Sequence, residues 1–181
     1  MFPAVALLEV SSIARGMVVT DACAKKAPVK LLASMPISPG RYITLFWGEV
    51  GEVEESFAEG VRVADTTLVD KLFLPQAHEQ LIEALLAVET PKPVDSIAIV
   101  ETFTIAATLL SADAACKAAE VGLLEVRLAT GIGGKAYFVL TGQLYDVEAG
   151  AEAAKAILSE SQLARLEIIQ NPSPDFLQLV W

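Results

Sequence analysis

The residues of this chain that could carry chemistry are few and scattered. His78 is the only histidine, so a serine or cysteine nucleophile would have a single imidazole to serve it. Cys23 and Cys116 lack the short spacing of a metal site, and we expect both to be small buried residues in a reducing compartment. Glu9 and Glu101 each end an apolar stretch, where we expect structural hydrogen bonds rather than paired catalytic acids. We therefore predict that the chain is not an enzyme.

A glycine-rich run over residues 131–135 has some likeness to a phosphate-binding loop. A P-loop would have glycine at Ala129 and serine or threonine at Ala136, and a helix would follow it. The residues that follow predict a strand instead. The run is therefore expected to be a loop between strands, with no nucleotide site.

Composition argues against two further classes of protein. The formal net charge of −10 disfavours a nucleic-acid partner, which requires clustered lysine and arginine. The most apolar stretch, residues 97–112, contains Glu101 and is too short to span a membrane. Residues 1–3 have no basic region or cleavage pattern, so we expect no secretory signal. The hydrophobic fraction of 54% instead favours large contacts between subunits.

The chain contains two copies of one unit. When residues 5–32 are compared with residues 97–124, eleven of the 28 positions are identical. The register then moves by two residues between Ser38 and Gly40, after which Gly40 matches Gly134. Because loops tolerate insertions, we expect the second copy to have the longer loop there.

The expected elements of each copy follow the order β-α-β-β-α-β. In the first copy they are strand 4–10, helix 13–27, strand 29–35, turn 36–40, strand 41–47, helix 50–63, strand 71–74 and helix 78–88. In the second copy they are strand 96–101, helix 104–119, strand 121–129, loop 130–134, strand 135–141, helix 144–158 and strand 165–170. The predicted fold class is therefore α+β, with two tandem ferredoxin-like domains, 1–88 and 96–181, and a proline-rich linker over 89–95. Each sheet should be mainly antiparallel with helices on one face, which leaves the other face to pair with another surface.

The same motifs recur in both copies. An apolar strand ending in or near glutamate precedes an Asp-Ala…Lys helix, and a later strand closes on glycine. These are residues 7–10, 21–27 and 48–50 in the first copy, and residues 99–102, 113–119 and 142–144 in the second. This order resembles the bacterial microcompartment (BMC) shell domain over nearly the whole chain. Because each copy opens with its first strand, the chain resembles the non-permuted class of tandem, trimer-forming shell proteins.

The resemblance implies a structural shell protein located in the microcompartment shell in the cytoplasm. Three chains would form a homotrimer in which six domains surround a central pore. This pseudohexamer would assemble with other BMC shell proteins, and neither a membrane nor a nucleic acid would be a partner. Small metabolites would pass through a pore lined by Ile37, Ser38, Pro39, Gly40, Thr130, Gly131, Ile132, Gly133 and Gly134. Lys25 and Lys117 would lie at the tile edge, although each also stands near a helix end where a cation offsets the dipole.

Two departures from the family pattern bear on these expectations. The chain is similar to the trimeric shell protein of propanediol-utilisation compartments, whose pore loop holds an iron–sulfur cluster, but the cysteine position is Ser38 here. Because such clusters need thiolate ligands, we predict no cofactor and no bound metal. Shell domains also often carry a tile-edge arginine after the last strand, and the matching runs, 75–78 and 172–175, contain none.

A function of another class remains open at this point. A ferredoxin-like trimer could sense a small molecule bound between its subunits. Electron microscopy would distinguish the two classes, because a shell tile forms hexagonal sheets whereas a sensor stays as discrete trimers.

Overall fold

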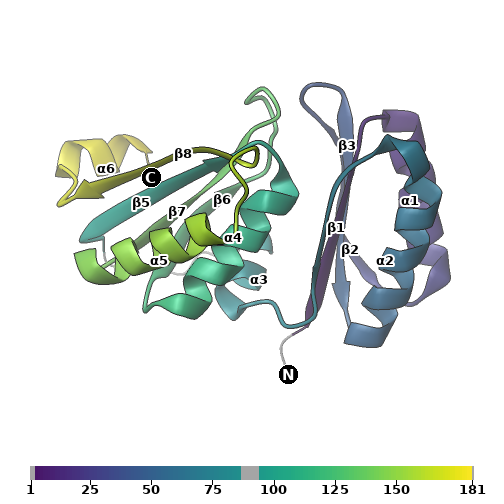
Figure 1. The fold of residues 1–181 in the computed structure, drawn as a ribbon, viewed down its shortest axis with the longest axis horizontal. Helices are drawn as coiled ribbons and strands as arrows, with labels where there is room; N and C mark the ends of the chain where they lie inside the picture. Colours follow the sequence, from purple (N-terminus) through teal and green to yellow (C-terminus); the bar gives the residue numbers. More distant parts are fainter. Residues whose placement is uncertain (1–2, 87–93, 181) are drawn as a thin grey trace.

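The chain folds into two lobes that lie side by side, each a four-stranded sheet with helices packed on it (Figure 1). The computed structural model describes residues 3–86 and 94–180. The first lobe contains β1 (Ala4–Val10), α1 (Ile13–Lys26), β2 (Lys30–Ile37), β3 (Arg41–Gly48), α2 (Val50–Ala64), the 3-10 turn η1 (Asp65–Thr67) and β4 (Leu68–Leu74). The next helix along the chain, α3 (Glu79–Leu85), packs against the second lobe. The second contains β5 (Ser96–Thr102), α4 (Ile105–Ala118), β6 (Gly122–Arg127), β7 (Ala136–Gly142), α5 (Leu144–Ala156), β8 (Leu163–Gln170) and α6 (Pro174–Val180).

Both sheets have the same topology. The strand order is β2-β3-β1-β4 in the first sheet and β6-β7-β5-β8 in the second, and the pairings within each are antiparallel. The registers also match, with Glu9 opposite Asp70 and Glu101 opposite Arg165. This confirms the predicted α+β class with two tandem ferredoxin-like units.

The elements depart from the sequence-based expectations at a few ends. β4 begins at Leu68 rather than at residue 71, because Leu68 still pairs with Val10 beyond a register shift. The helix expected over 78–88 is α3, which ends at Leu85. α6 was not expected; it begins with Pro174, at a first helical position where the missing N–H of proline is tolerated. Residues 89–93 of the expected linker lie outside the described residues.

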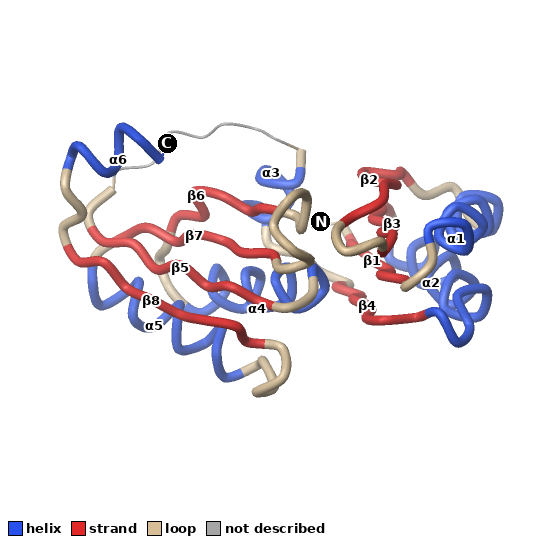
Figure 2. The backbone as a smooth tube through the Cα atoms, turned by 90° about the horizontal axis from the view of Figure 1, so that it is seen from above, coloured by secondary structure: helices blue, strands red, loops and turns tan. Residues whose placement is uncertain are grey.

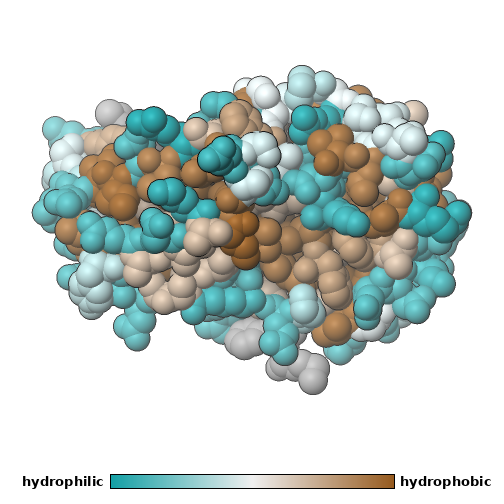
Figure 3. All heavy atoms as spheres, viewed as in Figure 1, coloured by the Kyte–Doolittle hydropathy of each residue, from teal (hydrophilic) through white to brown (hydrophobic). Residues whose placement is uncertain are grey.

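The layers alternate between helices and sheets (Figures 1 and 2). Helices α1 and α2 cover one face of the first sheet, and α4 contacts β1 and β4 of that sheet from the second lobe. Consequently all seven residues of β1 are buried. One apolar cluster lies within the first lobe, and a larger one joins the lobes by uniting Leu7 and Leu72 with Ile105 and Leu109. Figure 3 shows hydrophobic side chains gathered at the surface where the lobes meet.

Helix α4 is suited to this position by its composition. Asp113 and Lys117 are its only charged residues, and ten of its fourteen residues are buried. A helix that is apolar on most of its circumference is stable only when it is enclosed on several sides. The second sheet covers one side of α4 and the first sheet covers another, so this helix is the core of the contact between the lobes.

Candidate functional site

Two loops project from the same edge of the molecule and touch each other (Figure 1). The first connects β2 to β3 and is closed by the N–H of Gly40, which donates to the carbonyl of Ile37 at 3.0 Å. The second connects β6 to β7 and contains Gly134 with a φ of +86°. A Cβ atom on Gly134 would lie 2.8 Å from Cδ of Pro39 and 2.9 Å from the carbonyl oxygen of Ser38. Glycine is therefore needed at this contact for both its conformation and its size.

The structure places most of the residues predicted to line a pore on these two loops. The exposed ones are Pro39, Gly40, Thr130, Gly131, Ile132 and Gly133. Ser38 is half-buried, and Gly134 is buried against the first loop. The prediction that Ile37 lines a pore is wrong for its side chain. Ile37 is the last residue of β2, and its side chain is buried in the large apolar cluster. Ile37 therefore supports the loop and does not present a side chain to a pore.

The glycine-rich run also behaves as expected of a loop between strands. Residues 131–134 form turns, and β7 follows from Ala136 with no intervening helix. Because a P-loop directs its backbone N–H groups from the start of a helix, this segment lacks the geometry of a phosphate-binding loop.

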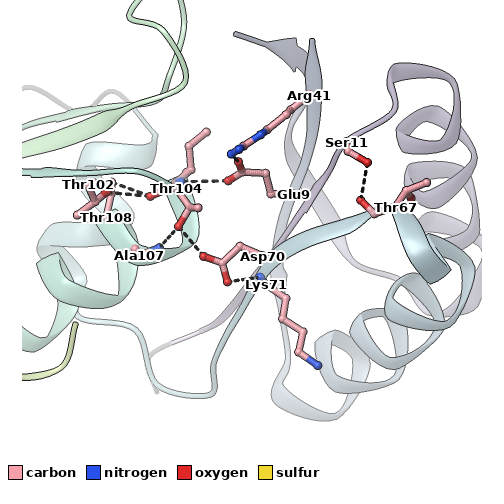
Figure 4. A network of polar contacts seen from close by, with 11 residues as sticks. Glu9, Ser11, Arg41, Thr67, Asp70, Lys71, Thr102, Thr104, Ala107 and Thr108 are labelled. Atoms are coloured by element: carbon pink, nitrogen blue, oxygen red, sulfur yellow. Dashed lines mark hydrogen bonds and ion pairs between the residues drawn. The ribbon is translucent and has the colours of Figure 1, made fainter. Parts of the chain in front are cut away.

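A buried carboxylate joins the two lobes (Figure 4). Glu9 is fully buried, and its Oε1 accepts a hydrogen bond from Nη1 of Arg41 at 2.6 Å. Its Oε2 accepts from the backbone N–H of Ile105, the first residue of α4, at 3.1 Å. Burial raises the pKa of Glu9, while the hydrogen bonds from Arg41 and Ile105 oppose that shift. The expectation of a structural hydrogen-bonding role for Glu9 is confirmed.

The start of α4 is held by further contacts from the first lobe. The Thr104 hydroxyl accepts from the backbone N–H of Ala107 at 3.2 Å, as an N-cap does. The same hydroxyl donates to Oδ2 of Asp70 on β4 at 2.5 Å. The N-terminus of α4, which carries the positive end of the helix dipole, therefore faces two carboxylates of the first lobe, those of Glu9 and Asp70.

The other end of α4 is tied to the loop that follows β4. Nζ of Lys117 donates to Oδ2 of Asp113 at 2.5 Å and to the carbonyl of Gln76 at 2.6 Å. Oδ1 of Asp113 accepts the backbone N–H of His78 at 2.7 Å. The His78 ring caps α3 by accepting from the backbone N–H of Gln80 at 3.3 Å, so the single histidine has a structural role.

The matching groups of the other copy have different surroundings. Lys25 pairs with Asp21 at 2.5 Å on the exposed surface of α1. Glu101 accepts from Nζ of Lys135 at 3.2 Å, and both side chains are partly exposed. The two predicted tile-edge lysines thus stand in unlike places, and their tile-edge role stays a prediction.

Sequence reasoning missed several residues that join the lobes. Gln80 of α3 ties the end of the first repeat to the second lobe by donating to the carbonyl of Val121 at 2.9 Å and accepting the N–H of Leu123 at 2.8 Å. The repeated Asp-x-x-x-Lys spacing is a signal that could have predicted the Asp113–Lys117 pair, because residues four apart are neighbours on a helix. No local signal marks Gln80, whose partners lie more than 40 residues away.

The two cysteines of the chain lie on helices and not on the two touching loops. Cys23 and Cys116 are buried in helices, and burial raises the pKa of the Cys23 thiol to about 12. In the ranges 3–86 and 94–180, no group of three or more histidine, cysteine, aspartate or glutamate residues could hold a metal ion. The pore-loop position has the hydroxyl of Ser38, which does not fit the thiolate requirement of an iron–sulfur cluster. Among the same residues, no helix is both long and apolar enough to cross a bilayer.

Comparison with known proteins identifies the family. The BMC domain model matches twice, over residues 4–77 and 96–172. The bacterial microcompartment shell protein PduT of Citrobacter freundii is 39% identical over 163 residues, which cover 90% of this chain and 89% of that protein. A microcompartment protein from Desulfitobacterium hafniense superposes with a TM-score of 0.90 at 37% identity, covering 99% of each chain. A fused permuted hexameric shell protein of the RMM microcompartment superposes with a TM-score of 0.64 at 21% identity, covering 85% of this chain and 80% of that one, and shares the fold alone. With two matched domains that together span most of its length, the chain belongs to the BMC-domain family.

Proposed function

We propose that this chain is a structural shell protein of a bacterial microcompartment, located in the compartment shell in the cytoplasm, and that three copies form one tile. The observation that carries the proposal is the contact between the lobes, in which the sheet of one domain covers the first helix of the other. The contact uses the sheet of the first domain and the first helix of the second domain. It therefore leaves unused the sheet of the second domain and the first helix of the first domain. Contacts between unlike surfaces of this kind form a closed ring when the rotation from one copy to the next permits it. Six domains from three chains complete such a ring.

The two touching loops supply a lining for the centre of the ring. Residues 38–40 and 130–134 project from one edge of the molecule, so a threefold axis near that edge would bring three copies of each loop together (Figure 1). Backbone N–H groups and the hydroxyls of Ser38 and Thr130 would then decide which small polar metabolites pass. Ser38 provides no thiolate, so we propose a pore without an iron–sulfur cluster.

The outer rim of the tile is proposed to meet other shell proteins. Lys25 is well exposed, and Lys117 remains 45% exposed while its ammonium holds the carbonyl of Gln76. Both lysines are available to neighbours at the end of a helix. In this assembly they serve as tile-edge contacts between trimers.

Two measurements test the proposed function. Light scattering should give three times 19.2 kDa, or 57.6 kDa, for the assembly in solution. Electron microscopy of concentrated protein should then show hexagonal sheets or incorporation into shells. A stable monomer at micromolar concentration contradicts the ring, and discrete trimers that never tile favour the small-molecule sensor instead.

A further inference from the structure

The matching helix–strand pairs of the two repeats are filled differently. In the first lobe, Phe57 of α2 and Phe73 of β4 stack with ring centroids 5.6 Å apart and an angle of 24° between the rings. Ala151 of α5 is the counterpart of Phe57 at a shift of 94 residues. Ile168 of β8 is the counterpart of Phe73, since each lies opposite the matching alanine of β1 or β5. The second lobe therefore lacks both aromatic rings at this place.

A pocket of about 480 Å³ lies where the rings are missing. It opens between α5 and β8, which lie side by side on the second lobe (Figures 1 and 2). Its volume is within the range of about 300–1,000 Å³ that is usual for small-molecule sites. The residues that line it include Glu148, Ala151, Glu152 and Lys155 of α5 and Leu166 and Ile168 of β8. The pocket therefore has an apolar floor beside a charged helix face.

The charged rim of this pocket is a feature of the second repeat. Glu148, Glu152 and Lys155 are exposed, and their spacing of four and three residues places them on one face of α5. The counterparts of Glu152 and Lys155 in the first repeat are Ala58 and Val61. Among the residues that the structure describes, neither glutamate forms an ion pair. Because like charges four residues apart on a helix repel each other, a cation between the two carboxylates would be stabilised.

The proposed ring leaves this pocket open. The matching helix of the first lobe, α2, packs mainly on α1, β1, β3 and β4 of its own lobe. Helix α4 reaches the first sheet from the opposite face, where Leu7 and Leu72 are buried. The contact between domains therefore does not cover the groove between α2 and β4, and the same contact would not cover the pocket between α5 and β8.

We propose that this pocket binds a small aromatic amine, with the aromatic ring on Ala151 and Ile168 and the ammonium between the carboxylates of Glu148 and Glu152. The stacked rings of the first lobe show that aromatic groups fit between this helix and this strand. Hydrogen bonds between an ammonium and a carboxylate are stronger than neutral ones, which favours a cationic ligand over a neutral one. The net charge of −10 also attracts cations to the protein.

Three probes with the same ring test the ligand class. Isothermal titration of the full chain with tryptamine, indole and indole-3-propionate compares a cation, a neutral molecule and an anion near neutral pH. Tryptamine should bind at least about tenfold more tightly than either of the others. Equal affinities, a preference for the anion, or no binding of tryptamine at millimolar concentration would each overturn the proposal.

Two double variants test the place of binding. Ala151→Phe with Ile168→Phe rebuilds the aromatic pair of the first lobe and should abolish the binding of all three probes. Glu148→Gln with Glu152→Gln should weaken tryptamine binding about tenfold and leave indole binding unchanged. Ala149→Phe is the matched control, since Ala149 is exposed on α5 and does not line the pocket, and it should bind tryptamine like the parent.

The outcomes separate this inference from the proposed function. Circular dichroism and light scattering check that each variant is folded and assembles like the parent. If the phenylalanine pair prevents folding, the glutamine pair still decides, because exposed glutamates can be replaced without disturbing a core. A folded phenylalanine pair or glutamine pair that binds tryptamine like the parent overturns the site. The shell tile stands or falls on its mass and its sheets, whichever way the probes bind.

Discussion

The carboxylate of Glu9 accepts the backbone N–H of Ile105 at 3.1 Å, across 96 residues of sequence. The first strand of one repeat thereby stabilises the start of the first helix of the other. The same carboxylate binds Arg41, the residue that follows the first pore loop. Glu9 therefore links the contact between the domains to the base of the loop proposed to line the pore.

The raised pKa of Glu9 predicts a pH dependence of stability. A carboxyl whose pKa is higher in the folded chain binds a proton more tightly there than in the unfolded chain. The contribution of Glu9 to the free energy of unfolding is therefore largest below its ordinary pKa of 4.5, and it falls as the pH rises through the raised value. Arg41 and Asp70 face the same group and should be left intact.

Urea unfolding of the parent and of Glu9→Gln at pH values below and above 4.5 measures the contribution of Glu9 to the free energy of unfolding. The free energy of unfolding of the parent relative to the variant should decrease as the pH rises above 4.5, because the glutamine does not titrate. If the difference in the free energy of unfolding between parent and variant stays constant or increases as the pH rises, burial does not dominate the pKa of Glu9.

The contact between the two loops predicts unequal effects of two alanine substitutions. Gly131 and Gly134 both have positive φ values, so alanine should cost about 1–2 kcal/mol at either position. Only Gly134 lies against Ser38 and Pro39; a Cβ on Gly131 would meet nothing within 4 Å. Gly134→Ala should therefore lower the free energy of unfolding further than Gly131→Ala. Equal losses in thermal or urea unfolding would mean that the two loops do not pack together.

The two lysines predict separable defects when each is changed to alanine. Lys117→Ala leaves Asp113 without its cation at the joint between the lobes, which should cost about 1–2 kcal/mol of stability. Lys25→Ala removes an exposed pair with Asp21 and should change stability by less than about 0.5 kcal/mol. The double variant should still form trimers yet be impaired in forming sheets or joining shells.

Light scattering and electron microscopy of the lysine variants, side by side with the parent, separate these effects. Normal tiling of the double variant would remove both lysines from the tile edge. Loss of the trimer in Lys25→Ala would place Lys25 inside the ring instead.

Ser38 predicts that a single substitution creates a metal site. The hydroxyl of serine stays protonated near neutral pH and binds iron poorly, whereas a thiolate is the usual ligand of iron–sulfur clusters. Threefold symmetry would bring three copies of residue 38 near one axis. Ser38→Cys, reconstituted anaerobically with iron and sulfide, should become brown and absorb broadly in the visible range.

The parent protein is the matched control and should stay colourless, because Cys23 and Cys116 are buried in helices away from the loop. A coloured parent would contradict the prediction. A folded, trimeric Ser38→Cys protein that takes up no cluster would count against residue 38 lying at the threefold axis.

Much of the local architecture could be predicted from the sequence because it depends on neighbouring residues. The repeat, the β-α-β-β-α-β order and the loop lengthened by two residues all follow from hydrophobic periodicity and from glycine and proline. The same patterns predicted the two loops, and the resemblance to shell proteins made their residues pore candidates; Ile37 was the exception. Its burial depends on which way the end of β2 faces, and that is decided by the core it packs on.

The contacts between the lobes were decided only by the tertiary structure. Ile13 and Ile105 are the same residue at matching positions, yet one is 40% exposed and the other 0%. Likewise Lys25 and Lys117 both pair with an aspartate four residues earlier, but Lys117 alone also binds Gln76. The same residue type at matching positions does not by itself encode such a difference, because the difference arises from what the rest of the chain places against each copy. The sequence by itself determined the repeated domain, and the packing of one copy on the other determined which surfaces are buried and which remain for another chain.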